Sequence, residues 1–255
     1  NNNFEMKDKF LKKILGLFGY KALDKEYYKN SRFLLSKSYL DINKILNHLF
    51  SKNKINSLVQ IGANDGELFD TLNNYIKKYN TKSLLVEPIK ENFEKLKKNY
   101  INFHNITFEN SAISIKNEIT YLYKVDPIRI KNYGDHIPGI TSFNKSHLIN
   151  HGVKKNDIIT EKVNTISIIN LLNKHEIKEL DLLFIDTEGY DGKIVNDFLN
   201  NSSLRPIIIL EFIHLKHNLF KELINNLESN KYVFFSINEN LICFPTEKKE
   251  SVNFN

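Results

Sequence analysis

The chain has 255 residues, 41% of them hydrophobic and 26% charged, and a chain of this size can bury one large core. Its 36 Lys and Arg residues against 30 Asp and Glu residues give a net charge of +6. The basic residues are scattered among acids, which disfavours a nucleic-acid-binding surface. The single cysteine, Cys243, excludes an intramolecular disulfide and a zinc site of several cysteines. The lack of a cysteine pair fits a reducing compartment, so we expect a cytoplasmic protein. No apolar run is long enough to predict a transmembrane helix.

The first 55 residues predict helices, because apolar residues recur at helical spacing over residues 4–18 and 38–52. We expect residues 1–55 to form an N-terminal helical extension that caps the sheet of the following domain. Covering the active site and forming a homodimer contact remain alternative roles for this extension.

From residue 56 to residue 255, short apolar runs alternate with helical patterns in one predicted domain. The predicted strands are residues 57–61, 83–86, 106–109, 180–185 and 206–210, with a terminal hairpin from 232–237 and 241–244. The predicted helices are residues 67–78, 89–99, 192–199 and 215–227. This alternation indicates an α/β doubly wound fold, with a mostly parallel sheet covered on both faces. Ligands of such sheets bind outside the carboxyl ends of the strands.

The middle of the chain breaks this rhythm. Residues 111–115 and 118–123 predict a second hairpin, and residues 126–144 show no clear periodicity. Loops of that length are usually functional or disordered. We therefore expect a substrate-side loop here, without a second hydrophobic core.

The first predicted strand ends in the glycine-rich turn Gly62-Ala-Asn-Asp-Gly66. Its two glycines allow a ligand to approach the backbone closely, but the turn is neither a P-loop nor the G-x-G-x-x-G dinucleotide motif. Asp65 would repel a pyrophosphate and would suit a cationic ligand such as S-adenosylmethionine. An ordinary strand-to-helix turn is the alternative.

The second predicted strand ends in Glu87. In a doubly wound sheet this carboxylate lies beside the glycine turn, where it can accept hydrogen bonds from both ribose hydroxyls of an adenosine group. This position indicates adenosine rather than a reaction type. The alternative is an acid at a helix start, which the helix dipole favours.

Acids also follow the next two predicted strands. Asp186, Glu188 and Asp191 come after the strand ending at residue 185, and Glu211 and His214 come after the strand ending at residue 210. If the strands are neighbours, these side chains converge, and nearby carboxylates raise one another's pKa or bind a cation. One group could act as general base for a hydroxyl. Alternatively, Asp186 and Glu211 could bind Mg²⁺ or Mn²⁺, or the acids could be helix caps and surface groups.

The segments at these strand ends resemble the FkbM-type methyltransferases over about residues 55–245, in the order of that family. The matching segments are Gln60–Gly66, Leu85–Pro88, Asn110–Ile113, Asp181–Asp191 and Pro206–Phe212. The most specific segment is Ile185-Asp-x-Glu-Gly189, whereas Phe184 stands where the family often has lysine. The resemblance implies a class I methyltransferase fold with seven strands, the last antiparallel. It also implies S-adenosylmethionine-dependent O-methylation, often of a sugar or polyketide hydroxyl.

The resemblance also implies roles for individual residues. The donor-binding candidates are Gln60, Gly62, Ala63, Asn64, Asp65, Gly66, Glu87, Pro88, Asn110, Ser111, Ala112, Thr141, Ser142, Asp186 and Thr187. From the residues themselves, the catalytic candidates are Asp186, Glu188, Glu211, His214 and His136. His214 is the preferred general base, because the pKa of histidine lies near neutrality.

We therefore expect an O-methyltransferase that acts on a sugar, such as a nucleotide-linked sugar for capsule or lipopolysaccharide biosynthesis. A nicotinamide-dependent sugar oxidoreductase is an alternative, but it should show G-x-G-x-x-G and a Tyr-x-x-x-Lys pair. An RNA methyltransferase would need a basic stripe with stacking aromatics. A non-catalytic nucleotide-binding protein would have little need for the acid cluster. We expect no nucleic-acid partner and no membrane insertion.

Overall fold

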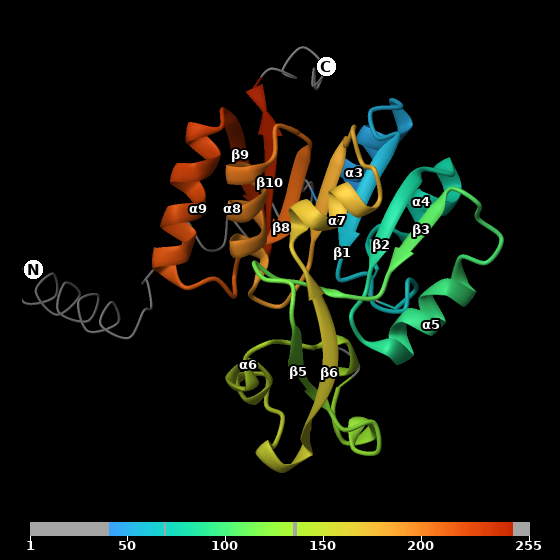
Figure 1. The fold of residues 1–255 in the computed structure, drawn as a ribbon, viewed down its shortest axis with the longest axis vertical. Helices are drawn as coiled ribbons and strands as arrows, with labels where there is room; N and C mark the ends of the chain where they lie inside the picture. The colour runs from blue at the N-terminus through green and yellow to red at the C-terminus, as the bar shows by residue number, and fades with distance from the viewer. Residues whose placement is uncertain (1–40, 69, 135–136, 247–255) are drawn as a thin grey trace, which may run out of the picture. The chain divides into compact units, whose positions relative to one another are not determined.

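The computed structural model describes residues 41–68, 70–134 and 137–246 (Figure 1). The helix predicted over residues 4–18 and the candidate base His136 lie outside the described residues. The features described below belong to the compact unit that begins at Ile42. None of the helices in the described ranges combines the length and the apolar character needed to cross a bilayer.

The described residues form a seven-stranded sheet in the order β3-β2-β1-β7-β8-β10-β9. Its strands are β1 (Ser57–Ile61), β2 (Lys82–Val86), β3 (Ile106–Glu109), β7 (Leu182–Ile185), β8 (Ile207–Glu211), β9 (Tyr232–Ile237) and β10 (Asn240–Pro245). The neighbours from β3 to β8 pair in parallel, and β10 is antiparallel to both β8 and β9. The predicted terminal hairpin and the class I methyltransferase arrangement are confirmed.

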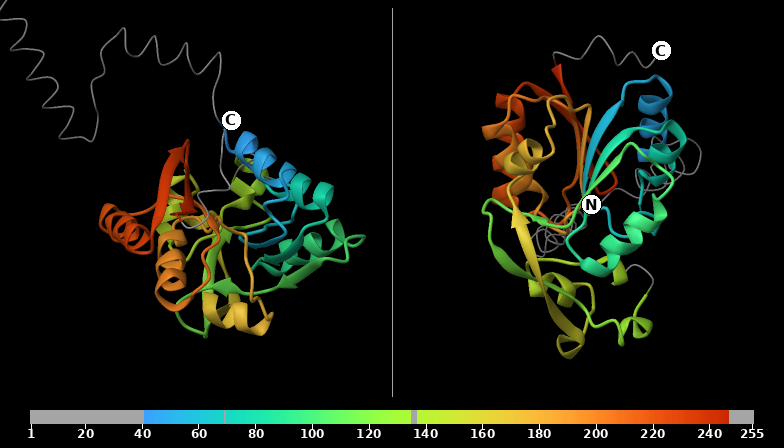
Figure 2. Two further views of the ribbon diagram at one scale, coloured as in Figure 1. Left: turned by 90° about the horizontal axis from the view of Figure 1, so that it is seen from above. Right: turned by 45° about the vertical axis from the view of Figure 1, so that its right-hand side comes forward.

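Helices cover both faces of the sheet, as the second view of Figure 2 shows. They are α3 (Ile42–Ser51), α4 (Asn73–Tyr79), α5 (Lys90–Asn99), α7 (Ile168–Lys174), α8 (Asp191–Asn201) and α9 (His217–Ser229). Helices α7, α8 and α9 share one hydrophobic core with the sheet, and α3, α4 and α5 share another. Alternate strand residues supply the two cores. Val59, for example, belongs to the first and Leu58 to the second, as expected for a strand buried on both faces.

The centre of the sheet fixes where a ligand can bind. Ile61, the last residue of β1, pairs with Val86 of β2 on one side and with Ile185 of β7 on the other. The carboxyl ends of these strands therefore lie at one edge, and the order of the sheet reverses at β1. Doubly wound sheets bind ligands at such a switch point.

The second predicted hairpin is wrong. The strands β4 (Ala112–Ile113) and β5 (Ile119–Val125) do not pair with each other, because β6 (Ile158–Ile166) lies between them, parallel to β4 and antiparallel to β5. The hydroxyl of Thr165 on β6 accepts the Glu118 N–H at 2.9 Å and donates to the Lys116 carbonyl at 2.7 Å. Thr165 therefore holds the turn that separates β4 from β5.

Strands β5 and β6 extend into a small lobe, defined here as residues 119–166, which lies below the main sheet in Figure 1. It also contains α6 (Lys145–Asn150) and the 3-10 turns η1 (Ile130–Asn132), η2 (Ile137–Gly139) and η3 (Lys155–Asp157). The small lobe has a hydrophobic core of its own, formed by Val125, Ile137, Ile140, Leu148, Val153 and Ile158. The expectation of no second core is therefore wrong, because apolar residues dispersed between residues 125 and 158 pack together.

The helix predicted from residue 67 begins only at Asn73. Two aspartates explain the delay, because each accepts backbone N–H groups that a helix would otherwise use. Asp65 accepts from Glu67 and Leu68 at 3.0 and 2.8 Å, and Asp70 accepts from Leu72 and Asn73 at 2.8 and 3.2 Å. Side-chain acceptors of this kind favour turns and helix starts over helix interiors.

Candidate active site

A cavity of about 370 Å³ lies at the switch point, where β1, β2, β7 and β8 end. This volume is in the range of small-molecule sites. Most of the predicted site residues line it, namely Gln60, Gly62, Ala63, Asn64, Glu87, Pro88, Ser111, Ala112, Thr141, Ser142, Asp186, Thr187, Glu188, Glu211 and His214. Asp65, Gly66 and Asn110 are not among the lining residues.

Gly62 brings the end of β1 against the end of β7. Its φ is +86°, and a Cβ at this position would lie 1.9 Å from the Asp186 carbonyl oxygen. The N–H groups of Gly62 and Ala63 both donate to the Val86 carbonyl at 3.0 Å. Because Gly62 has no side chain, the turn can connect the ends of β1, β2 and β7 at the floor of the cavity.

Gly66, by contrast, serves packing. A Cβ there would lie 2.5 Å from Leu96 Cδ1 and 2.8 Å from Tyr100 Cε2, both of which belong to the core beneath α5. The second glycine of the motif thus lets the turn approach α5 closely, away from the cavity.

Glu87 is buried, with 4% of its surface exposed. Its two carboxylate oxygens accept the N–H groups of Asn64 at 3.0 Å and Ile89 at 2.8 Å. Burial raises the pKa of Glu87 to about 7, although both hydrogen bonds act against this shift. Asn110 donates to the carbonyls of Glu87 and Pro88 at 2.8 and 3.0 Å. Asn110 therefore positions the Glu87 loop without lining the cavity.

Gln60 and Asp70 form a second polar group in the cavity wall. The Gln60 Nε2 donates to Asp70 Oδ1 at 2.9 Å. Gln60 Oε1 and Asp70 Oδ2 are shielded from solvent and have no hydrogen-bond donor among the described residues, a costly arrangement that a ligand N–H could relieve. Burial raises the pKa of Asp70. The structure thus places Asp70, rather than Asp65, at the cavity.

Acids gather where β7 and β8 end. Asp186 opens onto the cavity, but the surrounding protein displaces bulk water. This desolvation, with repulsion from Asp191 and Glu188, raises the pKa of Asp186 to about 8. Desolvation and the charges of Asp186 and Glu188 raise the pKa of Glu211 to about 9. Glu239, in the turn between β9 and β10, adds a further negative charge.

Asp191 shapes the loop that presents these acids. Its fully buried carboxylate accepts from the Thr187 hydroxyl at 2.8 Å and from the Gly189 N–H at 3.2 Å. Burial raises its pKa to about 6. The loop holds Glu188 at a φ of +55°, which a non-glycine residue adopts only under constraint. Asp191 is thus a positioning residue for Glu188.

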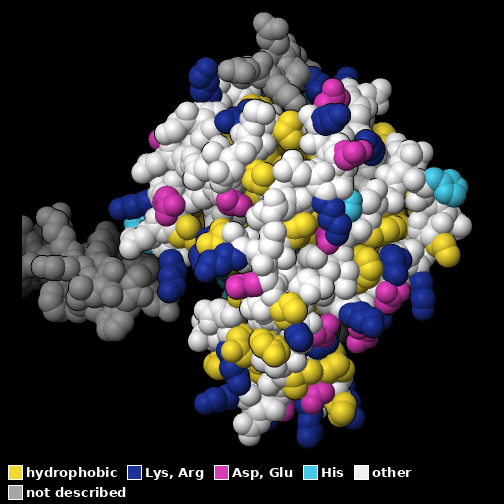
Figure 3. All heavy atoms as spheres, in the orientation of Figure 1, with side chains coloured by type: hydrophobic (Ala, Val, Ile, Leu, Met, Phe, Trp, Pro, Cys, Tyr) yellow, Lys and Arg dark blue, Asp and Glu magenta, His cyan; other side chains and the backbone are white. Residues whose placement is uncertain are grey.

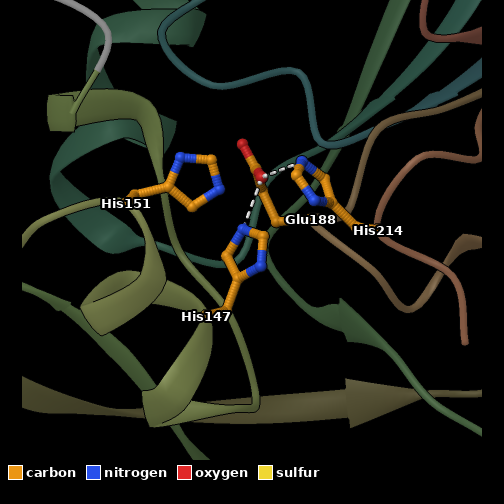
Figure 4. A group of neighbouring side chains, drawn as sticks. All are labelled: His147, His151, Glu188 and His214. Atoms are coloured by element: carbon orange, nitrogen blue, oxygen red, sulfur yellow. Dashed lines mark hydrogen bonds and ion pairs between the residues drawn. The ribbon is translucent and has the colours of Figure 1, made fainter. Parts of the chain in front are cut away.

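Histidines border the acids (Figure 4). His147 Nε2 lies 2.8 Å from Glu188 Oε2, and His214 Nε2 lies 3.8 Å from Glu188 Oε2 and 3.6 Å from Glu211 Oε2. Burial and the neighbouring His147 lower the pKa of His214. His151, at the end of α6, completes the group and lines the cavity.

Sequence reasoning missed Asp70, His147, His151 and Glu239. A signal existed for two of them, because His147 and His151 are four residues apart and so lie on the same side of a helix. The candidate metal ligands Asp186 and Glu211 do share the cavity. However, the described side chains whose ligand atoms converge are His147, His151, Glu188 and His214.

The family model described as "Methyltransferase FkbM domain" matches residues 60–234. The chain belongs to the FkbM methyltransferase family. The match spans the main sheet from β1 into β9, and it includes the small lobe and nearly all the cavity residues. The cavity is therefore the candidate active site of an FkbM methyltransferase domain.

Three of the solved structures that are similar to this FkbM domain come from bacteria. The first is an FkbM methyltransferase from Methylobacillus flagellatus KT, with 12% identity and a TM-score of 0.46, and the match covers 75% of this chain and 44% of that chain. The second is an O-methyltransferase from Bacillus cereus in complex with SAH, with 9% identity and a TM-score of 0.45, and the match covers 91% of this chain and 95% of that chain. The third is a methyltransferase from Geobacter sulfurreducens, with 8% identity and a TM-score of 0.42, and the match covers 92% of this chain and 95% of that chain. The chain spans less than half of the length of the first. A search of curated proteins finds no match.

Proposed function

We propose that the chain is an S-adenosylmethionine-dependent O-methyltransferase whose acceptor is a sugar hydroxyl. The observation that carries this proposal is that one cavity contains both the Glu87 carboxylate and the Gln60–Asp70 pair. Glu87 lies at the end of β2, and Gln60 and Asp70 leave two oxygens without donors at the end of β1. The donor brings a transferable methyl on a positively charged sulfur, an α-ammonium group and two ribose hydroxyls.

The lining residues suit this donor. Each oxygen of Glu87 accepts one backbone N–H and retains capacity for a further hydrogen bond, which the ribose hydroxyls would supply. The ammonium would donate to Gln60 Oε1 or Asp70 Oδ2. Ser111 and Ala112, just beyond β3, would border the adenine, as the family resemblance implies.

The acids that follow β7 and close β8 would face the positive sulfur. Asp186 and Glu211 are held at close quarters in a poorly solvated place, which is costly while no cation is present. A cationic donor would offset part of this repulsion, whereas the demethylated product carries no charge on its sulfur. The site is thereby suited to bind the donor and to release the product.

The acceptor hydroxyl would lie between the donor and the small lobe. In-line displacement at the methyl carbon depends mainly on the alignment of the two reactants, which Thr141 and Ser142 on the loop before α6 would help to fix. The C–O bond forms as the C–S bond breaks, and the hydroxyl proton must leave. His214 is placed to take it, because a pKa below its usual value keeps its imidazole neutral at pH 7. Glu211 is the second candidate, once the positive donor has lowered its raised pKa.

Other functional classes have less support. The described face in Figure 3 shows Lys and Arg side chains interspersed with Asp and Glu rather than gathered in a stripe, which argues against an RNA substrate. The FkbM family match favours methyl transfer over hydride transfer. A cytoplasmic role in preparing nucleotide-linked sugars for surface polysaccharide is the biological setting that we propose.

Calorimetry with S-adenosylmethionine, its demethylated product and NAD⁺ tests the donor. We expect micromolar binding of both methionine nucleotides and none of NAD⁺. Asp70→Asn should weaken binding of both methionine nucleotides, whereas Asp65→Asn should not, because Asp65 does not line the cavity. Binding of NAD⁺ alone would refute the proposal.

A further inference from the structure

Four side chains from three separate parts of the chain converge beside the cavity. His147 and His151 come from α6 and its carboxyl end, Glu188 from the loop before α8, and His214 from the loop after β8. Each offers one ligand atom, and these atoms all lie within 4.8 Å of one another. Figure 4 shows the three imidazole rings arranged around the Glu188 carboxylate.

The spacing of these atoms fits a metal centre. With bonds of 2.0–2.1 Å, ligands in a tetrahedral zinc site lie roughly 3.4 Å from one another. The distances from Glu188 Oε2 to His147 Nε2 and His214 Nε2, 2.8 and 3.8 Å, fall on either side of that value. Small side-chain rotations would bring both distances to the value that a zinc site requires.

The surrounding structure holds the four groups in place. His147 and His151 are one helical turn apart, and their ring centroids are 4.6 Å apart. The ring of His214 lies 4.6 Å from that of His147 and 5.2 Å from that of His151. Glu188 keeps its left-handed backbone, and its carbonyl accepts the Ser142 hydroxyl at 3.3 Å. A constrained backbone at this position points to a functional demand on the Glu188 side chain.

The donor set selects the kind of ion. Three imidazoles and one carboxylate suit zinc and other first-row divalent transition metals, whereas Mg²⁺ prefers an all-oxygen environment. The side chains of His147, Glu188 and His214 are 11%, 22% and 20% exposed, so an ion could enter from the cavity.

We propose that His147, His151, Glu188 and His214 bind one divalent transition-metal ion, with Zn²⁺ as the best match to this donor set. Three of the ligands line the cavity, so the ion would contact the acceptor. Its role rests on the proposed function. An ion at this place would take the acceptor hydroxyl as a fifth ligand and lower the pKa of that hydroxyl. His214 would then be occupied as a ligand, and Glu211, ionised beside the positive ion, would take the proton.

Metal binding is measured on the whole chain, without methyl donor or acceptor. The protein is stripped with a chelator and titrated calorimetrically with Zn²⁺, Mn²⁺ and Mg²⁺, and Co²⁺ is followed by its visible absorption. We expect one Zn²⁺ per chain and no heat from Mg²⁺. His147→Ala and Glu188→Gln should each weaken Zn²⁺ binding by about a hundredfold or more, since even outer partners of metal ligands contribute tenfold to hundredfold.

His217→Ala is the matched control, because His217 is exposed on α9, outside the cluster, and its loss should leave the affinity unchanged. Circular dichroism shows which variants fold. If His147→Ala does not fold, the Zn²⁺ affinity of Glu188→Gln decides whether the metal site exists. Absence of stoichiometric Zn²⁺ binding to the unaltered chain, or equal affinity in Glu188→Gln, would overturn the metal site. Neither result would contradict the proposed function. That function would fail if the metal-loaded chain transferred no methyl group.

Discussion

Gly62→Ala tests whether the junction of β1 and β7 builds the active site. The added Cβ would lie 1.9 Å from the Asp186 carbonyl oxygen, and relief of this contact requires the two strand ends to separate by about 1 Å or more. That movement would stretch the 2.9 Å hydrogen bond from the Asp186 N–H to the Ile61 carbonyl. It would also displace the Asp186 carboxylate from the cavity.

The cost has two parts. A left-handed backbone costs an alanine roughly 1–2 kcal/mol, and overpacking typically adds about 1–3 kcal/mol. We expect the free energy of unfolding to fall by about 3 kcal/mol. A misplacement of about 1 Å near reacting groups costs on the order of a hundredfold in rate, so turnover should fall by that factor in the folded fraction.

Gly152→Ala is the matched control for backbone strain. Gly152 has a φ of +85°, but a Cβ there would meet no atom within 4 Å. Its substitution should cost only the roughly 1–2 kcal/mol of the backbone term and leave turnover nearly unchanged. Urea unfolding and methyl transfer below the melting temperature measure the two effects. Equal stability and equal turnover in the two variants would refute the steric account of the junction.

Further predictions concern two buried carboxylates. Glu87→Gln removes the ionised acceptor proposed for the ribose, and calorimetry should show donor affinity reduced about tenfold to hundredfold; unchanged affinity would exclude that role. Because burial raises the pKa of Glu87 to about 7, its ionised fraction falls with pH. Donor affinity should therefore weaken about fourfold to twelvefold from pH 7 to pH 5.5, and the pH profile of Glu87→Gln should be flatter in that range. Buried Glu109 accepts from Lys174 at 2.7 Å and His175 at 2.8 Å; burial acts to raise its pKa, but these partners lower it overall. Glu109→Gln should reduce the free energy of unfolding by about 2 kcal/mol at neutral pH, a value discounted because Lys174 is half exposed. A carboxyl whose pKa is lowered by folding stabilises the folded state above its unfolded-state pKa, and this stability is lost as the pH falls through the folded-state pKa. Chemical unfolding should therefore show that the difference in free energy of unfolding between the unaltered chain and Glu109→Gln shrinks below about pH 4.5.

The main sheet could be predicted because its strands are short apolar runs with a polar residue at each carboxyl end. Burial on both faces forces this composition, and parallel pairing brings the polar ends together. Glu87, Asp186 and Glu211 could therefore be assigned to one cavity without knowledge of the coordinates. The order of the central strands follows from the same doubly wound topology.

The small lobe could not be predicted in the same way. Strand β6 pairs with β5 from Ile119↔Asn164 to Val125↔Ile158, and the chain between the strands includes a helix and three 3-10 turns. Pairing over such a separation leaves no local signal. The spacing of His147 and His151 puts them on one side of a helix, but they join Glu188 and His214 only because this lobe places α6 beside the loop of Glu188.

Asp70 escaped prediction for a different reason. Its Oδ1 accepts the N–H groups that start α4. In the sequence, an acid that only starts a helix looks the same as an acid that also lies in a ligand site. The hydrogen bond from Gln60 to the same Oδ1, and the shielding of Oδ2 from solvent, depend on the tertiary structure alone.

The most direct test of the central claim is methyl transfer itself. The chain is incubated with methyl-labelled S-adenosylmethionine and pooled nucleotide sugars, and the products are followed by mass spectrometry and NMR. We predict demethylated donor and an O-methylated sugar in equal amounts, both strongly reduced by Glu211→Gln. Absence of product, with the donor bound and Zn²⁺ supplied, would contradict the sugar as acceptor. A labelled methyl found on nitrogen or carbon would contradict O-methylation.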